Sequence, residues 1–147
     1  MIKRILLTLD GSPLAEEAIH PAILHAQAHE AELHILRVVS PPTKSYRAGK
    51  ASLSAIETAE RDLKFMAQDY LDDKVEQLSS NGLNVQAAMR NGQPYEIIIQ
   101  YATKNKIDLI VMARRGESGL TRWLIGSVTD HVVRASPIPV LVVPVVK

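Results

Sequence analysis

The chain of 147 residues contains no cysteine, so a disulfide framework, a thiol nucleophile and a thiolate metal site are all excluded. Its charges almost cancel, because 17 Lys and Arg stand against 16 Asp and Glu, and the formal net charge is +1. A general binder of nucleic acids or of membrane surfaces usually carries a clear basic excess. The charge balance therefore argues against both of these classes.

Long apolar runs are also lacking, and no segment approaches the roughly 20 apolar residues that a membrane-spanning helix needs. The first residues, MIKRILLTLD, have the pattern of a strand and lack the apolar segment and cleavage site of a signal peptide. A chain of this length suits one well-buried core rather than two. We expect a single cytoplasmic domain over residues 1–147.

The residues that are present predict strands that alternate with helices. Strands are expected at 2–9, 33–39, 83–89, 107–112 and 139–146. Helices are expected from Ser12 to about residue 30, over 53–78, from Pro94 onward and over about 128–135. A loop rich in turn formers and basic residues is expected over 40–52.

Two of these helices allow more detailed predictions. Ser12 suits the N-cap of the first helix and Pro13 its first position, while Pro21 predicts a kink inside it. The long helix over 53–78 is predicted to bury one stripe, formed by Leu53, Ile56, Leu63, Met66, Tyr70, Val75 and Leu78.

Alternating strands and helices favour parallel pairing, and strands that are apolar throughout fit a sheet covered on both faces. The predicted fold class is therefore α/β, with a single doubly wound parallel five-stranded sheet flanked by helices, in the Rossmann-like manner. Ligands of such sheets bind beyond the carboxyl ends of the strands, where the winding reverses. Asp10 and the segment after the fourth strand both belong to that end.

The segment MARRGESGLTRWLIGS, from Met112 to Ser127, joins the fourth strand to the last helix. Gly116 and Gly126 permit close backbone approach to an anion, and Ser127 stands at a helix start whose N–H groups favour negative charge. The alternative from spacing alone is that the glycines serve turns, while Ser127 and Asp130 form a capping-box pair. The spacing leaves both interpretations open.

The chain resembles the universal stress protein family along nearly its whole length. That family carries G-x2-G-x9-G-[ST] after its fourth strand, and the matching span here is Ala113-x2-Gly116-x9-Gly126-Ser127. The segments KRILLTLDGS, NGQPYEIIIQYATKNKIDLIVMA and SPIPVLVVP are similar to further parts of the family pattern. The combined match is specific, whereas any one segment alone is weak.

The resemblance implies that the ligand is ATP, with Mg²⁺ as its companion ion. Asp10 is expected beside the adenosine with Thr8 and Leu9, Val38 in the adenine pocket, and Met112 at the ribose or base. The phosphates are expected within Ala113, Arg115, Gly116, Gly126, Ser127 and Val128. One departure matters, because Ala113 replaces the first glycine of the motif, and its methyl group is harmful if the backbone there needs a positive φ.

Other candidate sites have weaker signals. His20, His25, His29 and His34 cluster in the sequence, and a metal site is weighed against solvent-facing or locally bonded side chains. Lys44, Arg47 and Lys50 form either a lid over phosphates or a solvated loop, and Trp123 is expected to anchor packing or a dimer. No P-loop and no catalytic set of nucleophile, base and orienting residue is recognisable.

We therefore expect an adenine-nucleotide-binding regulatory module that is read by a protein partner. The alternatives are a dimeric interaction protein that binds no nucleotide and, less favoured, a slow ATPase. The apolar final strand should lie at a sheet edge, which predicts a homodimer through residues 139–146. The alternative is that another part of the same chain covers this strand, with the long helix over 53–78 as the candidate.

Overall fold

The computed structural model of the protein describes residues 1–40, 53–115 and 124–145. The strands are β1 (Arg4–Thr8), β2 (Glu32–Val39), β3 (Val85–Asn91), β4 (Leu109–Ala113) and β5 (Val140–Val143). The helices are α1 (Pro13–Glu16), α2 (Ile19–His29), α4 (Leu53–Ser79), α5 (Pro94–Lys104) and α6 (Ser127–Ala135). The strands form one sheet in the order β3-β2-β1-β4-β5 with every pair parallel, which confirms the predicted fold class.

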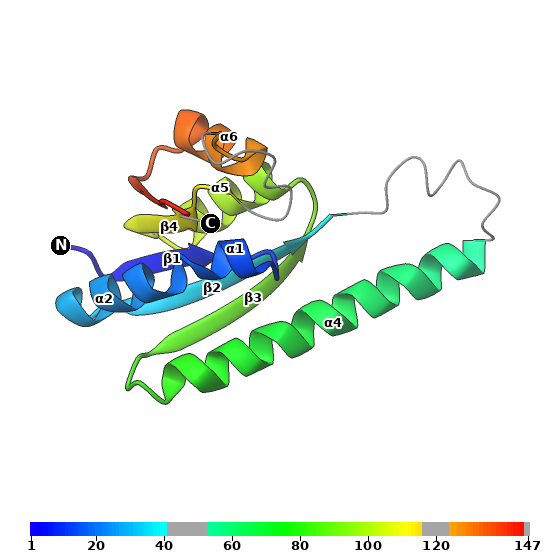
Figure 1. The fold of residues 1–147 in the computed structure, drawn as a ribbon, viewed down its shortest axis with the longest axis horizontal. Coiled ribbons are helices and arrows are strands. Elements are labelled where there is room, and N and C mark those ends of the chain that lie inside the picture. Colours follow the sequence, from blue (N-terminus) through cyan, green and yellow to red (C-terminus); the bar gives the residue numbers. More distant parts are fainter. Residues whose placement is uncertain (41–52, 116–123, 146–147) are drawn as a thin grey trace.

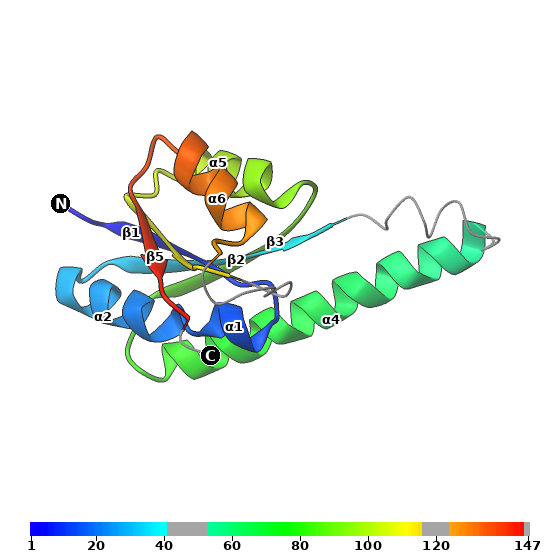
Figure 2. The ribbon, with the colours of Figure 1, turned by 45° about the horizontal axis from the view of Figure 1, so that its top comes forward.

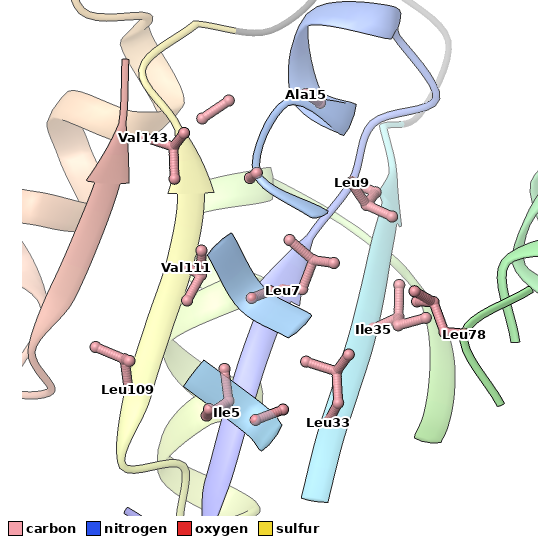
Figure 3. Close-up of a cluster of buried hydrophobic side chains, with 14 of the residues drawn as sticks. Ile5, Leu7, Leu9, Ala15, Leu33, Ile35, Leu78, Leu109, Val111 and Val143 are labelled. Carbon is pink, nitrogen blue, oxygen red and sulfur yellow. The ribbon is translucent and has the colours of Figure 1, made fainter. Parts of the chain in front are cut away.

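Helices cover both faces of this sheet, with α1, α2 and α4 on one side and α5 and α6 on the other (Figures 1 and 2). Side chains along a strand alternate between the faces, so Leu7 and Val111 enter one core and Leu6 and Ile110 enter the other. Figure 3 shows the first core, where side chains of β1, β2 and β4 point to the same face. Each fully buried aliphatic side chain contributes about 1.5–3 kcal/mol to this packing.

The first helical region differs from its prediction at Pro21. Instead of one kinked helix, the chain forms α1 and α2, and the interruption lies at residues 17–18. Pro21 is the third residue of α2, where its missing N–H has no intrahelical partner to lose. The predicted N-cap is confirmed, because the Ala15 backbone N donates to Ser12 Oγ at 3.2 Å and Pro13 follows at the first position.

The long helix α4 buries only part of the predicted stripe. Of the predicted residues, Leu78 is buried, whereas Leu53 and Met66 remain 72% and 64% exposed. The prediction missed Ala67 and Leu71, which are also buried. Figures 1 and 2 show the reason, since the amino-terminal half of α4 extends past the carboxyl ends of the strands it packs on. Helical periodicity predicted an apolar face, but the length of the sheet limits how much of that face is covered.

The last strand, β5, lies at the edge of the sheet as predicted and pairs with β4. Its side chains at Val140, Leu141 and Val142 are half-buried. The alternative that the long helix covers this strand is wrong, because α4 packs on β3 and β2, which lie at the opposite edge of the sheet from β5. The predicted strand at 139–146 is shorter in the structure, and Val146 lies outside the described residues.

Candidate functional site

A cavity of about 490 Å³ lies beyond the carboxyl ends of β1 and β4. From β1 the chain adds β2 and β3 on one side of the sheet, and it then crosses back to add β4 and β5 on the other side. The winding therefore reverses between β1 and β4. The backbones that follow β1 and β4 diverge there, and the crevice between them is the usual ligand site of doubly wound folds. We call this space the central cavity.

Ten of the eleven residues that the sequence predicts for the site line the central cavity. They come from the ends of three strands and from the start of α6, and they are Thr8, Leu9, Asp10, Val38, Met112, Ala113, Arg115, Gly126, Ser127 and Val128. The eleventh, Gly116, lies outside the described residues, as do Lys44, Arg47, Lys50 and Trp123. The parallel register brings together segments that are more than a hundred positions apart in the chain.

The Asp10 end of the cavity is shaped by a tight turn between β1 and α1. The Ser12 backbone N donates to Asp10 Oδ1 at 2.8 Å, so the carboxylate both caps this turn and lines the cavity. Gly11 has φ +87°, a backbone conformation that residues with a side chain rarely adopt. The turn therefore fixes the carboxylate at the cavity rim, where Asp10 is exposed to solvent.

The other end of the cavity is the first turn of α6. Its N-cap is Gly126, with φ −62° and no side-chain capping bond, and Ser127 is the first helical residue. The predicted capping-box pair of Ser127 and Asp130 is wrong, because Ser127 is not the N-cap. The Asp130 carboxylate accepts bonds from Arg134 Nε at 3.0 and 3.1 Å. First-turn N–H groups of a helix lack intrahelical acceptors, so this end presents donors and a partial positive charge.

Two hydrogen bonds hold the α6 end against strand β4. The Gly126 backbone N donates to the Arg114 carbonyl at 2.8 Å, and Thr129 Oγ1 donates to the Ala113 carbonyl at 2.9 Å. Thr129 is buried, so its bond is shielded from water. The two bonds hold together the residues on either side of 116–123, a segment that lies outside the described residues.

Ala113 departs from the family motif without backbone strain. Among the described residues, the non-glycine positions with positive φ are Glu30 and Lys106, so Ala113 does not need the freedom of glycine. It is the last residue of β4, pairs with Val143 and packs its methyl group into the core shared with Ala15. Alanine at position 113 would be harmful only if the backbone there needed a positive φ, and it does not.

The adjacent arginines diverge at the end of β4. Arg115 is 5% exposed and lines the central cavity. Arg114 instead faces β5, where its backbone N donates to the Val143 carbonyl at 2.8 Å and its Nη2 donates to the Val145 carbonyl at 3.2 Å. Of this pair, Arg115 supplies positive charge to the cavity, and Arg114 ties the loop to the edge strand.

Sequence reasoning missed nine described residues of the cavity wall: Ala15, Leu36, Arg37, Val39, Ser40, Leu63, Pro94, Ile98 and Thr129. Arg37 is the most consequential, because it brings a second cation to the wall. It lies on β2, and no motif marks it. The available signal was its place directly before the predicted Val38, because both residues lie near the carboxyl end of β2, where the cavity opens.

The Arg37 side chain packs against a polar cluster formed by Tyr70, Lys74 and Glu16. Its guanidinium carbon lies 5.1 Å from the centroid of the Tyr70 ring on α4, and Lys74 Nζ lies 5.3 Å from the same centroid. Lys74 Nζ donates to Glu16 Oε1 at 2.6 Å, and burial together with the Glu16 carboxylate raises the pKa of the Tyr70 hydroxyl. Tyr70 therefore stays neutral at physiological pH and offers its ring to both cations.

The histidines do not form a metal centre in the part of the chain that the structure describes, where no group of three or more His, Asp or Glu is placed to hold an ion. His25 and His29 stack with ring centroids 6.1 Å apart, and His20 and His29 are exposed. His34 is locally bonded rather than solvent-facing, because its Nε2 lies 2.6 Å from Glu32 Oε1. It is 3% exposed, and its Nδ1 is hydrogen-bonded to the Tyr101 hydroxyl of α5 at 2.8 Å.

The central cavity thus has two chemically different ends joined by an apolar middle. Asp10 offers a hydrogen-bond acceptor at one end, whereas the α6 amino terminus and Arg115 offer donors and positive charge at the other. Leu36, Val38 and Met112 supply apolar surface between them. Such an arrangement suits a ligand with a flat, weakly polar group and an anionic tail.

The fold and the site define a doubly wound α/β protein with a ligand cavity at its switch point. The model of the universal stress protein family matches residues 1–144, and the chain belongs to that family. It is 34% identical to universal stress protein MJ0531 of Methanocaldococcus jannaschii over 97% of this chain and 82% of that protein. It is 30% identical to universal stress protein YxiE of Bacillus subtilis over 97% and 99%.

Solved structures support the same fold. Universal stress protein UspA from Lactobacillus plantarum superposes with a TM-score of 0.80 at 26% identity, with 97% of each chain covered. A universal stress protein solved in complex with cAMP superposes with a TM-score of 0.66 at 24% identity, covering 97% of this chain and 96% of that one. Within the described residues, no helix has the length and apolar content to cross a membrane.

Proposed function

We propose that this universal stress protein binds an adenine nucleotide, with ATP as the ligand, in the central cavity and acts as a regulatory module. The observation that carries the proposal is that one cavity is lined by the Asp10 carboxylate, by apolar side chains and by the first turn of α6, which presents backbone N–H donors. The base would contact Val38 and Asp10, and the phosphates would lie against Gly126, Ser127 and Val128, with Gly116 closing the cradle from the loop.

The charges of the cavity support this orientation of the nucleotide. A triphosphate placed at Asp10 would meet a carboxylate beside the Arg37 guanidinium, whereas the α6 end offers backbone N–H groups together with the Arg115 guanidinium. Mg²⁺ is usually held by phosphate oxygens and water with few carboxylates. The ion would therefore enter as Mg-ATP rather than occupy a site built by the protein alone.

Regulation would work through ordering of the loop. The nucleotide would bind between the two ends of the loop, which the Gly126–Arg114 and Thr129–Ala113 bonds already hold together. Binding would order residues 114–125, and a protein partner would recognise that surface. Among the described residues that line the cavity, no nucleophile and base are paired for hydrolysis. Phosphate release measured against Asp10→Ala tests the slow-ATPase alternative.

The test is thermal unfolding with and without Mg-ATP. A ligand at 100 times its dissociation constant stabilises a fold by about 2.7 kcal/mol, so millimolar Mg-ATP should raise the Tm if the affinity is micromolar. Gly126→Val should abolish the rise, because its side chain would block the approach of the phosphates to the backbone. Since Gly126 has φ −62°, valine meets no steric barrier of the left-handed region.

A matched control is Ala135→Val, at the exposed far end of the same helix, which should keep the response to ATP. Mass spectrometry of nucleotide released on denaturation gives an independent readout. No Tm shift and no binding heat with ATP, ADP or AMP would refute nucleotide binding and favour the dimeric interaction protein.

A further inference from the structure

A second, smaller hollow of about 200 Å³ adjoins the central cavity, and we call it the side cavity. It lies between the end of β2, the helix α4 and the turn that follows β3. Val39, Ser40 and Leu63 line both hollows, so the two spaces share a wall. Glu60, Lys64, Asn91 and Gly92 belong to the side cavity alone.

The strand order fixes where the side cavity lies relative to a bound nucleotide. From β4 the sheet continues through β1 and β2 to β3. The anion-binding end is next to β4, the Asp10 and Val38 end is next to β1 and β2, and the side cavity is between β2 and β3. A nucleotide with its phosphates at α6 therefore directs the far edge of its base toward the side cavity.

In adenine, the edge remote from the ribose is the one that carries N6. We propose that the site accepts an adenine nucleotide substituted on N6, with the substituent in the side cavity. This inference rests on the proposed function and names a ligand class for the same site. An N6 with one substituent keeps one N–H, which is enough for a hydrogen bond to a carboxylate such as Asp10.

The walls of the side cavity indicate the chemistry of the substituent. Val39 and Leu63 present apolar surface, and Leu63 is 43% exposed. Glu60, Lys64 and Asn91 supply donors and acceptors around it. An aromatic or branched hydrocarbon group would cover Leu63, which unsubstituted adenine would leave in contact with water.

The experiment is calorimetric titration of the full chain with ATP, N6-benzyl-ATP and 8-benzylamino-ATP. Covering about 40 Å² of apolar surface corresponds to about a fivefold gain in affinity, so N6-benzyl-ATP should bind about five times more tightly than ATP. The 8-substituted analogue carries a group of similar size beside the glycosidic bond. It should show no gain, because that position points away from the side cavity.

Two variants test whether the gain arises in the side cavity. Asn91→Trp at the end of β3 and Leu63→Trp on α4 each place a large ring in it, and each should remove the preference for N6-benzyl-ATP over ATP. Phe65→Trp is the control, because Phe65 is 68% exposed on α4 and lines neither cavity. Asn91 is exposed at the end of β3, so a large side chain there should not prevent folding. The Asn91→Trp variant therefore still tests the inference if Leu63→Trp fails to fold.

The outcomes separate this inference from the proposal on which it rests. Binding of ATP together with an N6 preference that both filled variants lose supports the inference. Binding of ATP with no N6 preference, or with a preference that survives in both filled variants, overturns it and leaves the proposed function standing. Absence of binding by all three nucleotides overturns both.

Discussion

The guanidinium carbon of Arg37 lies 5.1 Å from the centroid of the Tyr70 ring and joins the central cavity to the long helix α4. The same guanidinium fills the space beside Gly11, where an added Cβ would collide with it. Cation–π contacts of this kind contribute about 0.5–2 kcal/mol, depending on how far they are removed from water. Gly11, Arg37 and Tyr70 thus act as one packed unit at the Asp10 end.

Gly11→Ala tests this unit. Alanine at φ +87° should cost about 1 kcal/mol of stability, and its methyl group should displace the Arg37 side chain. Gly82→Ala is a matched control, since φ there is +77° and no atom lies within 4 Å of the added Cβ. Urea unfolding should show similar backbone losses, with the larger total loss in Gly11→Ala. Equal losses in the two variants would contradict a packed role for Arg37.

Ala113→Gly restores the motif glycine and should make the protein less stable. Ala113 is 5% exposed and sits in a strand, so the variant loses a buried methyl group and gains backbone freedom, at about 1–2 kcal/mol. Ala87→Gly on β3 is the control for the backbone cost alone, because Ala87 is exposed. A gain in stability for Ala113→Gly in thermal unfolding would show that the methyl group is strained.

Tyr101→Phe should cost about 1–2 kcal/mol, because it leaves the buried His34 Nδ1 without its bond to the hydroxyl. His34 Nε2 lies 2.6 Å from Glu32 Oε1, so the ring is held from both sides. Tyr95→Phe is the control, since the Tyr95 hydroxyl donates to Glu96 at an exposed position. Chemical denaturation of both variants should separate them, and equal stabilities would rule out an energetic role for the His34–Tyr101 bond.

Asp108→Asn should reduce stability in a pH-dependent manner. Asp108 Oδ2 accepts from the Lys3 backbone N at 2.8 Å and from the Arg4 backbone N at 3.0 Å, and these bonds lower the pKa of the carboxyl below its ordinary value. Because the folded pKa is depressed, the stabilisation is fully present above the unfolded pKa and is lost as the pH falls through the folded pKa.

The difference between the native protein and Asp108→Asn should therefore be about 1 kcal/mol above about pH 5 and should shrink below about pH 4. Urea midpoints measured across this range provide the check. A difference that is constant down to about pH 2 would mean that the charge of Asp108 contributes nothing.

Val142→Lys tests the predicted homodimer. Val142 lies on the edge strand β5, and a lysine there would place two charges within an antiparallel two-fold interface through residues 139–146. Light scattering should report a dimer for the native protein and a monomer or precipitate for the variant. Leu24→Lys, at a 52% exposed position on α2, should remain dimeric. A native monomer across micromolar concentrations would exclude this assembly.

The sequence by itself determined the order of the elements and most of the site. Alternating strands and helices allowed only a parallel sheet with its ligand end at the strand carboxyl termini, and local turn chemistry marked Asp10 and Gly126. These features depend on short-range rules of periodicity, caps and glycine placement, which hold wherever the segments lie in space.

Tertiary structure decided the features that depend on distance through space. Arg37 reaches the cavity because β2 pairs with β1 in one particular register, and Leu53 and Met66 are exposed because α4 is longer than the sheet beneath it. A periodic pattern defines a face of a helix, but only the packed neighbours determine whether that face is buried.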